Sequence, residues 1–232
     1  MTSQAIIVTG MHRSGTSLVM SFLENLGVYC GSKDELLASS EENPKGYWEH
    51  PKILEFNDAV LHLLSSSWSD LALNGSFRSL PQTVQLSLNQ DIRELITSIF
   101  EGHNLWGIKD PRISLLLPLW QNVMPDAKYI VCVRNPIETS FSLANRFTKY
   151  HIRFEKGLDL WKRYNEKLIA DLITDNVLFV HYNALFADID SELERIIKFV
   201  YGESLEIEKL VKKAKSDYLP KGRHFAFSKE SV

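Results

Sequence analysis

The sequence has few cysteines, no long apolar run and no excess of basic residues, and each shortage excludes a class of protein. Two cysteines in 232 residues suggest neither a disulfide framework nor a metal cluster. No apolar run approaches the length of a membrane span, and no signal peptide is recognisable at the N-terminus. The net charge of -3 gives no basic footprint for nucleic acid. We therefore expect a cytoplasmic protein without a membrane span that does not bind nucleic acid.

Apolar runs and helical patterns alternate along the chain. The runs that read as strands are 5–8, 105–108, 129–133 and 177–180, and the first of them suits a buried parallel strand. The segments with helical periodicity are 15–26, 51–64, 83–100, 136–150, 154–175, 188–201 and 205–215. No repeat or linker divides them, so residues 1–232 are expected to form a single domain. The alternation predicts a three-layer α/β fold whose mostly parallel sheet, of about five strands, is flanked by helices.

The loop GMHRSGTS, from Gly10 to Ser17, follows the first strand and opens the first helix. Its spacing almost matches the phosphate-binding P-loop G-x-x-x-x-G-K-[ST], and the fold class is accordingly P-loop-type. A glycine-rich loop in this context turns its amides toward one point, and the helix N-terminus adds partial positive charge. Anion binding is therefore favoured over an ordinary tight turn.

The P-loop lysine is missing, because Thr16 occupies its position, and a basic residue stands instead at Arg13. A nucleoside triphosphatase needs that lysine and an acid at a strand end that holds Mg²⁺. Here one strand ends in Arg134, and Asp110 directly follows Lys109. A site rich in cations and poor in metal ligands fits a sulfuryl group, which carries little charge and needs no metal.

GMHRSGTS resembles the 5′-phosphosulfate loop of sulfotransferases that use 3′-phosphoadenylyl sulfate (PAPS). VCVRNPIETSFSLANR, residues 131–146, resembles the segment of the same family that binds the 3′-phosphate, with Arg134 and Ser142 at the matching positions. Taken alone, R-N-P could be a simple strand-to-helix turn. With both motifs in the family's order, the binding interpretation is favoured. WGIKDPR and NPKGYWEH look like segments of bacterial PAPS sulfotransferases, and the lysine region also resembles tyrosylprotein sulfotransferases.

The resemblance implies a set of cofactor contacts and catalytic groups. The implied cofactor-binding residues are His12, Arg13, Ser14, Gly15, Thr16, Ser17, Arg134, Ser142, Lys221, Gly222 and Arg223. The last three lie in KGRHF, which resembles a C-terminal basic loop over the cofactor, although such a segment is equally often only solvated. Arg13 and Lys109 are expected to stabilise charge that develops on the leaving phosphate.

A base must remove the proton of the acceptor, and the candidates are the neighbours Glu49 and His50. We favour Glu49 by analogy with the tyrosylprotein enzymes. The competing interpretation is that Glu49 merely begins a helix and His50 is its N-cap.

The acceptor is expected to be a hydroxyl compound: a carbohydrate, a lipid, a small molecule or a peptide tyrosine. The 65–82 stretch, with Trp68 and Phe77, would wall its pocket, unless Trp68 is only a core residue beneath a loop. Two other classes of function stay open. One is a P-loop kinase that uses ATP and Mg²⁺, and the other is a catalytically silent module that holds a nucleotide anion. Our favoured function is metal-independent sulfuryl transfer from PAPS, with 3′-phosphoadenosine 5′-phosphate (PAP) as the product.

Overall fold

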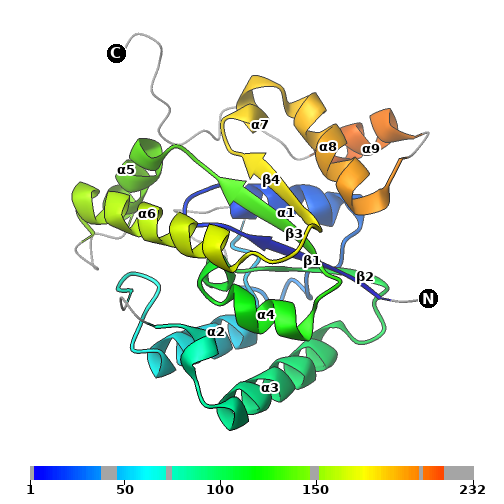
Figure 1. Cartoon of the computed structure of the whole chain (residues 1–232). Coiled ribbons are helices and arrows are strands. Elements are labelled where there is room, and N and C mark those ends of the chain that lie inside the picture. The colour runs from blue at the N-terminus through cyan, green and yellow to red at the C-terminus, as the bar shows by residue number, and fades with distance from the viewer. Residues whose placement is uncertain (1–2, 38–45, 72–74, 147–151, 204–205, 217–232) are drawn as a thin grey trace.

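A computed structural model describes residues 3–37, 46–71, 75–146, 152–203 and 206–216. Its centre is a sheet of four parallel strands in the order β2-β1-β3-β4 (Figure 1). The strands are β1 (Gln4–Thr9), β2 (Leu105–Lys109), β3 (Lys128–Val133) and β4 (Val177–His181). Since all four run in one direction, their carboxyl ends meet at one edge, where open α/β sheets bind ligands.

The α/β class and the parallel sheet are confirmed, but the expected count of about five strands is wrong among the described residues. The position beside β2 where another strand would lie holds a single parallel bridge, between Tyr29 and Trp106. The amide of Tyr29 donates to the carbonyl of Leu105, and that of Gly107 donates to the carbonyl of Tyr29. The chain turns away on both sides of Tyr29, so this pairing never extends into a strand.

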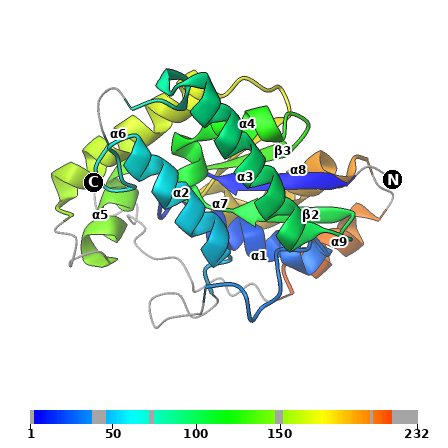
Figure 2. The same ribbon diagram turned by 90° about the horizontal axis from the view of Figure 1, so that it is seen from below.

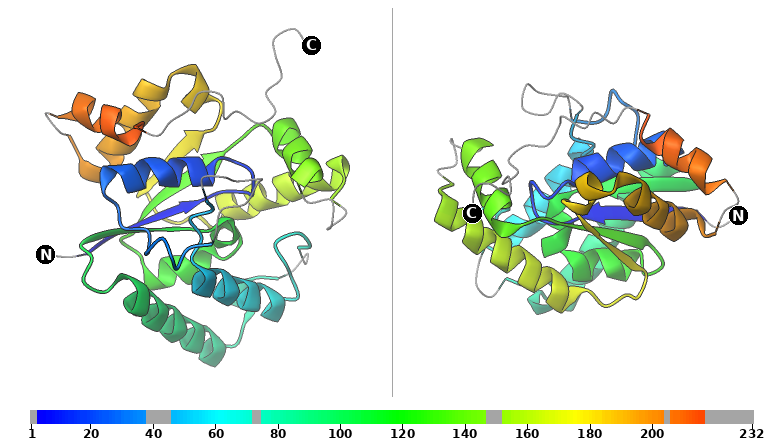
Figure 3. Two further views of the ribbon diagram at one scale, coloured as in Figure 1. Left: turned by 180° about the vertical axis from the view of Figure 1, so that it is seen from behind. Right: turned by 90° about the horizontal axis from the view of Figure 1, so that it is seen from above.

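Helices cover both faces of the sheet. One face carries α1 (Thr16–Leu26), α7 (Ala184–Ala187), α8 (Ile189–Tyr201) and α9 (Ile207–Ala214), as Figure 3 shows from behind and from above. The other carries α2 (Pro51–Leu63), α3 (Gln82–Phe100), α4 (Leu117–Val123) and α6 (Phe154–Asp171), with α5 (Pro136–Arg146) packed on α6 (Figures 1 and 2). Two short 3₁₀ helices, η1 (Phe77–Ser79) and η2 (Pro111–Leu115), complete the elements.

The helix ends follow local signals in the sequence. Pro51 occupies the first turn of α2, where a missing amide costs nothing. The Asp188 carboxylate accepts the amide of Ser191 at the start of α8. Gly27 ends α1 in the left-handed conformation that a side chain would disfavour. No described helix is both long enough and apolar enough to cross a membrane.

The turn after β1 depends on Gly10. A Cβ atom there would stand 2.2 Å from the carbonyl oxygen of Cys132 in β3, and φ is +131°. Gly27 has a similar φ of +103°, but a Cβ atom would meet nothing within 4 Å. Alanine substitutions at the two positions therefore distinguish the cost of backbone strain from the cost of a steric clash.

We predict that Gly27→Ala lowers the free energy of unfolding by about 1–2 kcal/mol, the cost of a left-handed alanine. Gly10→Ala should cost about 1–3 kcal/mol more, because the new methyl group overpacks against β3. Urea unfolding of both variants measures the difference. Equal losses would show that β3 yields easily to the methyl group.

Candidate active site

The Gly10–Ser17 loop bends sharply between β1 and α1. Arg13 has φ of +69° and Gly15 has φ of +95°, both in the left-handed region. A Cβ atom at Gly15 would lie 2.5 Å from the Tyr182 ring, so only glycine fits there. Gly15 is the N-cap of α1 and makes no side-chain cap bond. The first amides of α1 therefore remain available to an anion, as helix geometry dictates.

The two sequence motifs meet in space. The Nε of Arg13 donates to the Oγ of Ser142 at 2.8 Å, although the residues are 129 positions apart. Nη1 of Arg134 donates to the carbonyl oxygen of Arg13 at 3.2 Å. The phosphate loop and the segment after β3 thus bring two guanidinium groups and a hydroxyl into one cluster.

Arg134 is buried and held from three directions. Its Nε donates to the Glu138 carboxylate at 3.1 Å, one helical turn further on. Its guanidinium lies 4.2 Å from the centre of the Tyr182 ring, in cation–π geometry. The same ring packs against Gly15, so Tyr182 touches both motifs. Arg134 is therefore preorganised, which reduces the entropy lost on binding an anion.

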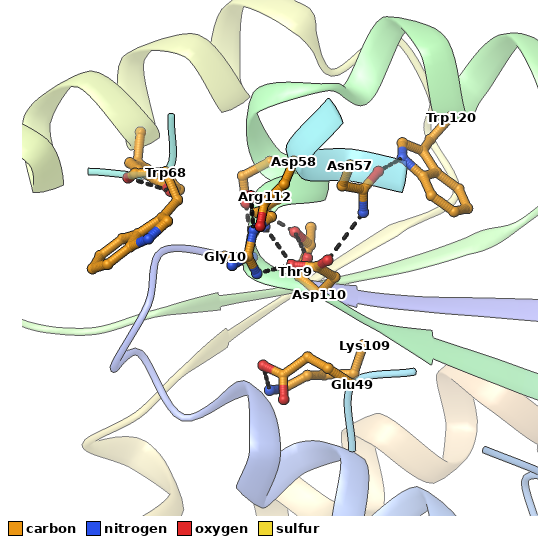
Figure 4. A network of polar contacts seen from close by, with 12 residues as sticks. Thr9, Gly10, Glu49, Asn57, Asp58, Trp68, Lys109, Asp110, Arg112 and Trp120 are labelled. Atoms are coloured by element: carbon orange, nitrogen blue, oxygen red, sulfur yellow. Dashed lines mark hydrogen bonds and ion pairs between the residues drawn. The ribbon is translucent and has the colours of Figure 1, made fainter. Parts of the chain in front are cut away.

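Lys109 and Glu49 form a buried ion pair between the carboxyl end of β2 and the residue before His50 (Figure 4). Burial raises the pKa of the Glu49 carboxyl above its ordinary value, and the Lys109 charge offsets part of that effect. Lys109 binds Oε1 of Glu49, whereas Oε2 is buried and has no hydrogen-bond partner among the described residues. One carboxylate oxygen is therefore left for another group.

His50 occupies the N-cap position of α2, but its side chain makes no cap bond. Its Nδ1 is buried and lacks a hydrogen-bond partner within the described part of the chain. Burial lowers the pKa of His50 below its ordinary value, so the ring is neutral at pH 7. The expectation that His50 is the N-cap of α2 is confirmed for its position but not for its side chain, and both base candidates keep an open polar atom.

Asp110 faces the opposite side of the sheet from Lys109, because successive residues of a strand alternate (Figure 4). Its carboxylate accepts from the side chain of Asn57 at 3.0 Å and pairs with Arg112 at 3.3 Å. Arg112 also pairs with Asp58, and Asn57 accepts from the Trp120 indole. Asp110 and Arg112 thus form a structural ion pair.

This network ties α2 to the phosphate loop. The Oγ of Ser114, in η2, accepts the amide of Gly10 at 2.9 Å and lies 2.8 Å from the hydroxyl of Thr9. The Thr9 hydroxyl also donates to the carbonyl of Asp110 at 3.1 Å. The first residues of the loop and the helix that follows Glu49 are therefore joined through Asp110.

The remaining predicted site residues have varied surroundings. Ser14 and Thr16 are buried, and Ser17 donates to the carbonyl of Tyr47 at 3.4 Å. Phe77 lies in the hydrophobic core, so the expectation that it walls an acceptor pocket is wrong. Residues 221–223 lie outside the described residues.

Several residues of the site were missed from the sequence, chiefly Asn57, Asp58, Ser114, Glu138, Arg146 and Tyr182. A signal existed for Asn57, which interrupts the apolar stripe of α2 formed by Ile53, Val60 and Leu61. Tyr47 and Arg146 pair by hydrogen bond and by stacking. No local pattern announces such long-range partners.

The site concentrates positive charge. Burial and the neighbouring Arg146 and Arg134 lower the pKa of Arg13 to about 10. Lys109, Arg112 and Arg134 each have a carboxylate partner. Among the described residues, the hydrogen-bond partner of the Arg13 side chain is the neutral Ser142. An anion is therefore expected next to Arg13.

His12 points to the other side of the loop. Its ring centre lies 4.7 Å from that of Trp68, in the stretch after α2, and 6.1 Å from that of Tyr164 in α6. The pKa of His12 is held well below its ordinary value by burial and by four cations, of which Arg112 and Lys109 act most strongly. The imidazole is therefore neutral at pH 7.

A family profile described as the sulfotransferase family matches residues 5–204. Sulfotransferase STF9 from Mycobacterium avium is 16% identical, covers 98% of this chain and 71% of its own, and superposes with a TM-score of 0.54. STF1 from Mycobacterium tuberculosis is 17% identical over 91% of this chain and 71% of its own, with a TM-score of 0.51.

The sulfotransferase domain of the Synechococcus PCC 7002 olefin synthase is 19% identical over 94% of this chain and 82% of its own, with a TM-score of 0.50. These solved structures establish the likeness of fold. No curated protein sequence matches the chain significantly.

We predict that His12 makes the stability of the protein depend on pH. Below the ordinary value of 6.5, the unfolded chain binds a proton that the folded His12 excludes. The neutral His12 therefore contributes to the stability of the fold above pH 6.5, and this contribution is lost as the pH falls toward the pKa of His12 in the folded protein. The free energy of unfolding of the wild type, relative to His12→Gln, should drop between pH 7 and 5 with a slope approaching about 1.4 kcal/mol per pH unit. Chemical denaturation across this range measures it, and a constant difference would mean that the folded ring takes up the proton.

Proposed function

The chain belongs to the sulfotransferase family, so its reaction is sulfuryl transfer from PAPS, and we propose that it sulfates a hydroxyl acceptor by in-line displacement without a metal ion. The observation that supports this proposal most is the junction of Arg13, Ser142 and Arg134. Two anion-binding elements from distant parts of the sequence share one surface there. Such a pair suits a nucleotide with phosphates at both the 5′ and the 3′ positions.

We assign the 5′-phosphosulfate to the loop from His12 to Ser17 and the 3′-phosphate to Arg134 and Ser142. The fit rests on charge and on backbone space. Arg13 has a neutral partner among the described residues, and the N-cap residue Gly15 has no side chain to bond the first amides of α1. Lys221, Gly222 and Arg223 remain proposed contacts from the resemblance alone. PAPS would supply the sulfuryl group and depart as PAP.

Glu49 is the proposed base. Because burial raises its pKa, the carboxylate is a stronger base than an exposed glutamate, and its Oε2 is open. Uptake of a proton would neutralise Glu49 and weaken its bond to Lys109. The Lys109 charge would then be available to the developing charge on the leaving oxygen, alongside Arg13. His50 stays the second candidate, because its neutral ring also has an open nitrogen.

Family membership favours sulfuryl transfer over a kinase with ATP and Mg²⁺ or a silent anion-binding module. The proposed acceptor remains a hydroxyl of a carbohydrate, lipid, small molecule or peptide tyrosine. We also propose one domain over residues 1–232 and a cytoplasmic location, where the two buried free thiols, Cys30 and Cys132, would stay reduced.

We predict that PAP binds in EDTA about 10–100-fold more tightly than AMP. AMP lacks the 3′-phosphate and forfeits charged hydrogen bonds that are each worth about 1.5–3 kcal/mol. Adenosine 2′,5′-bisphosphate is the matched control, with the same charge at the wrong carbon. Calorimetry with the three nucleotides, and with ATP and Mg²⁺, measures the order. Equal affinity for AMP and PAP would refute the assignment of Arg134 and Ser142, and Mg²⁺-dependent ATP binding would support the kinase.

We also predict that the role of Glu49 as the base can be distinguished from the role of Lys109 as a cation by varying the pKa of the acceptor. Lys109→Met should lower turnover about 10²–10³-fold for every acceptor, as for the loss of one preorganised donor. Glu49→Gln should be most harmful with an alkyl alcohol and less so with an acidic phenol, which is already partly ionised.

Rates of the two variants and of His50→Asn with labelled PAPS and graded acceptors test this prediction. The double variant Glu49→Gln/Lys109→Met controls for the unpaired charge that each single change leaves buried. Full turnover of Glu49→Gln with alkyl acceptors, together with loss in His50→Asn, would transfer the role of base to His50.

A further inference from the structure

His12 is a loop residue that does not face the helix of its own loop. Its ring contacts Trp68 and Tyr164, which belong to the opposite side of the sheet from α1. The Tyr164 hydroxyl donates to the carbonyl oxygen of Trp68 at 2.8 Å, which fixes the two aromatic residues relative to each other. The side chain of His12 therefore connects the phosphate loop to the stretch that is expected to wall the acceptor pocket.

The Nε2 atom of His12 is buried and has no hydrogen-bond partner among the described residues. A buried polar atom without a partner is costly, and native proteins keep few of them. Glu49 Oε2 and His50 Nδ1 share this condition, and both belong to candidates for the base. The Nε2 atom of His12 is therefore a polar group that a bound molecule would satisfy.

The hydrogen-bonding properties of the imidazole restrict which chemical groups can be the partner of Nε2. A neutral imidazole nitrogen is a donor in one tautomer and an acceptor in the other. Sulfuryl and phosphate oxygens only accept, so they suit one tautomer, whereas a hydroxyl can both donate and accept and suits either. Burial, and then the cations around the ring with Arg112 and Lys109 foremost, disfavour a protonated His12. His12 is thus suited to orient a hydroxyl rather than to remove its proton.

We propose that His12 is an acceptor-binding residue, whose Nε2 hydrogen-bonds the acceptor hydroxyl while Trp68 forms the adjoining wall. This inference rests on the proposed function and revises one part of it, since the sequence pattern assigns His12 to the cofactor. The proton would go to Glu49 or His50, and His12 would hold the oxygen in line.

Two substitutions distinguish the packing of the His12 ring from the hydrogen bond made by its Nε2 atom. His12→Phe keeps an aromatic ring against Trp68 and removes the hydrogen bond, whereas His12→Gln keeps a neutral polar group of similar reach. His103→Phe is the matched control, because the exposed His103 stacks on Tyr29, with ring centres 3.4 Å apart, at the far end of β2. Each variant is titrated with PAP by calorimetry, which also reports whether it has folded.

Turnover is then measured with ³⁵S-labelled PAPS against 2-naphthol, N-acetylglucosamine and tyrosine methyl ester, with release of sulfate to water as a fourth reaction. We expect His12→Phe to bind PAP within about twofold of the wild type and to lose at least about tenfold in kcat/KM for the acceptor that the wild type prefers. His12→Gln should recover part of that loss, and His103→Phe should behave as the wild type.

The outcomes distinguish the two proposals. A wild type that neither binds PAP nor transfers sulfate to any of the four would refute the proposed function itself. A competent wild type whose PAP affinity falls tenfold or more in His12→Phe, with KM for the acceptor unchanged, would return His12 to the cofactor. Unchanged kinetics in His12→Phe would likewise overturn the acceptor role.

Discussion

Positive charge buried at the carboxyl edge of the sheet is the constraint around which this molecule is organised. A buried cation is tolerated only when a nearby group offsets the loss of water. Lys109 has Glu49, Arg112 has Asp110 and Asp58, and Arg134 has Glu138. The described partner of Arg13 is a serine hydroxyl, which carries no charge. The compensation is therefore complete for the supporting cations and incomplete for the one in the phosphate loop, which is where the negatively charged phosphosulfate of the cofactor would complete it.

The parallel sheet makes this arrangement possible because it alternates side chains across its edge. Lys109 and Asp110 are neighbours in sequence, but they serve opposite faces (Figure 4). Lys109 reaches Glu49 near the phosphate loop, while Asp110 reaches Asn57 in α2. Since Glu49 lies just before α2, one strand end holds the base candidate directly through Lys109 and supports its helix through Asp110. The relation between base, cation and loop is thereby fixed by a rigid sheet rather than by a flexible connection.

The sequence predicts those parts of the site whose signals are local. Gly10, Arg13, Gly15, Arg134 and Ser142 stand out because a strand, a tight loop and a helix follow one another at fixed spacing. Ser114 and Tyr182 do not, because their roles come from contacts with Gly10 and Gly15, which lie more than 100 positions away in the sequence. Nothing in the sequence around either residue, a serine after K-D-P-R-I and a tyrosine after a strand, indicates that it will contact the phosphate loop.

The error in the strand count has a similar origin. A fifth strand would need several consecutive residues that pair with β2, whereas here only Tyr29, among the described residues, forms a bridge to it. The positions of the buried strands were readable because each needs an apolar run on both faces. Departures at element ends, such as α6 finishing at Asp171 rather than near residue 175, reflect packing that periodicity does not contain.

The positive φ of Arg13 explains how one short loop can serve two ligands. A left-handed residue reverses the local course of the backbone, so adjacent side chains are sent in different directions. His12 turns toward Trp68 and Tyr164, and Arg13 turns toward Ser142 in α5. An arginine in this conformation is strained, and such strain persists only where surrounding contacts determine it, here the Ser142 hydroxyl on its side chain and Arg134 on its carbonyl. The bend thus joins the Arg13 guanidinium, suited to the leaving phosphate, to the neutral ring of His12, suited to an incoming hydroxyl. In-line displacement requires this juxtaposition, because the attacking oxygen must approach the transferring group from the side opposite the bond that breaks to the leaving oxygen.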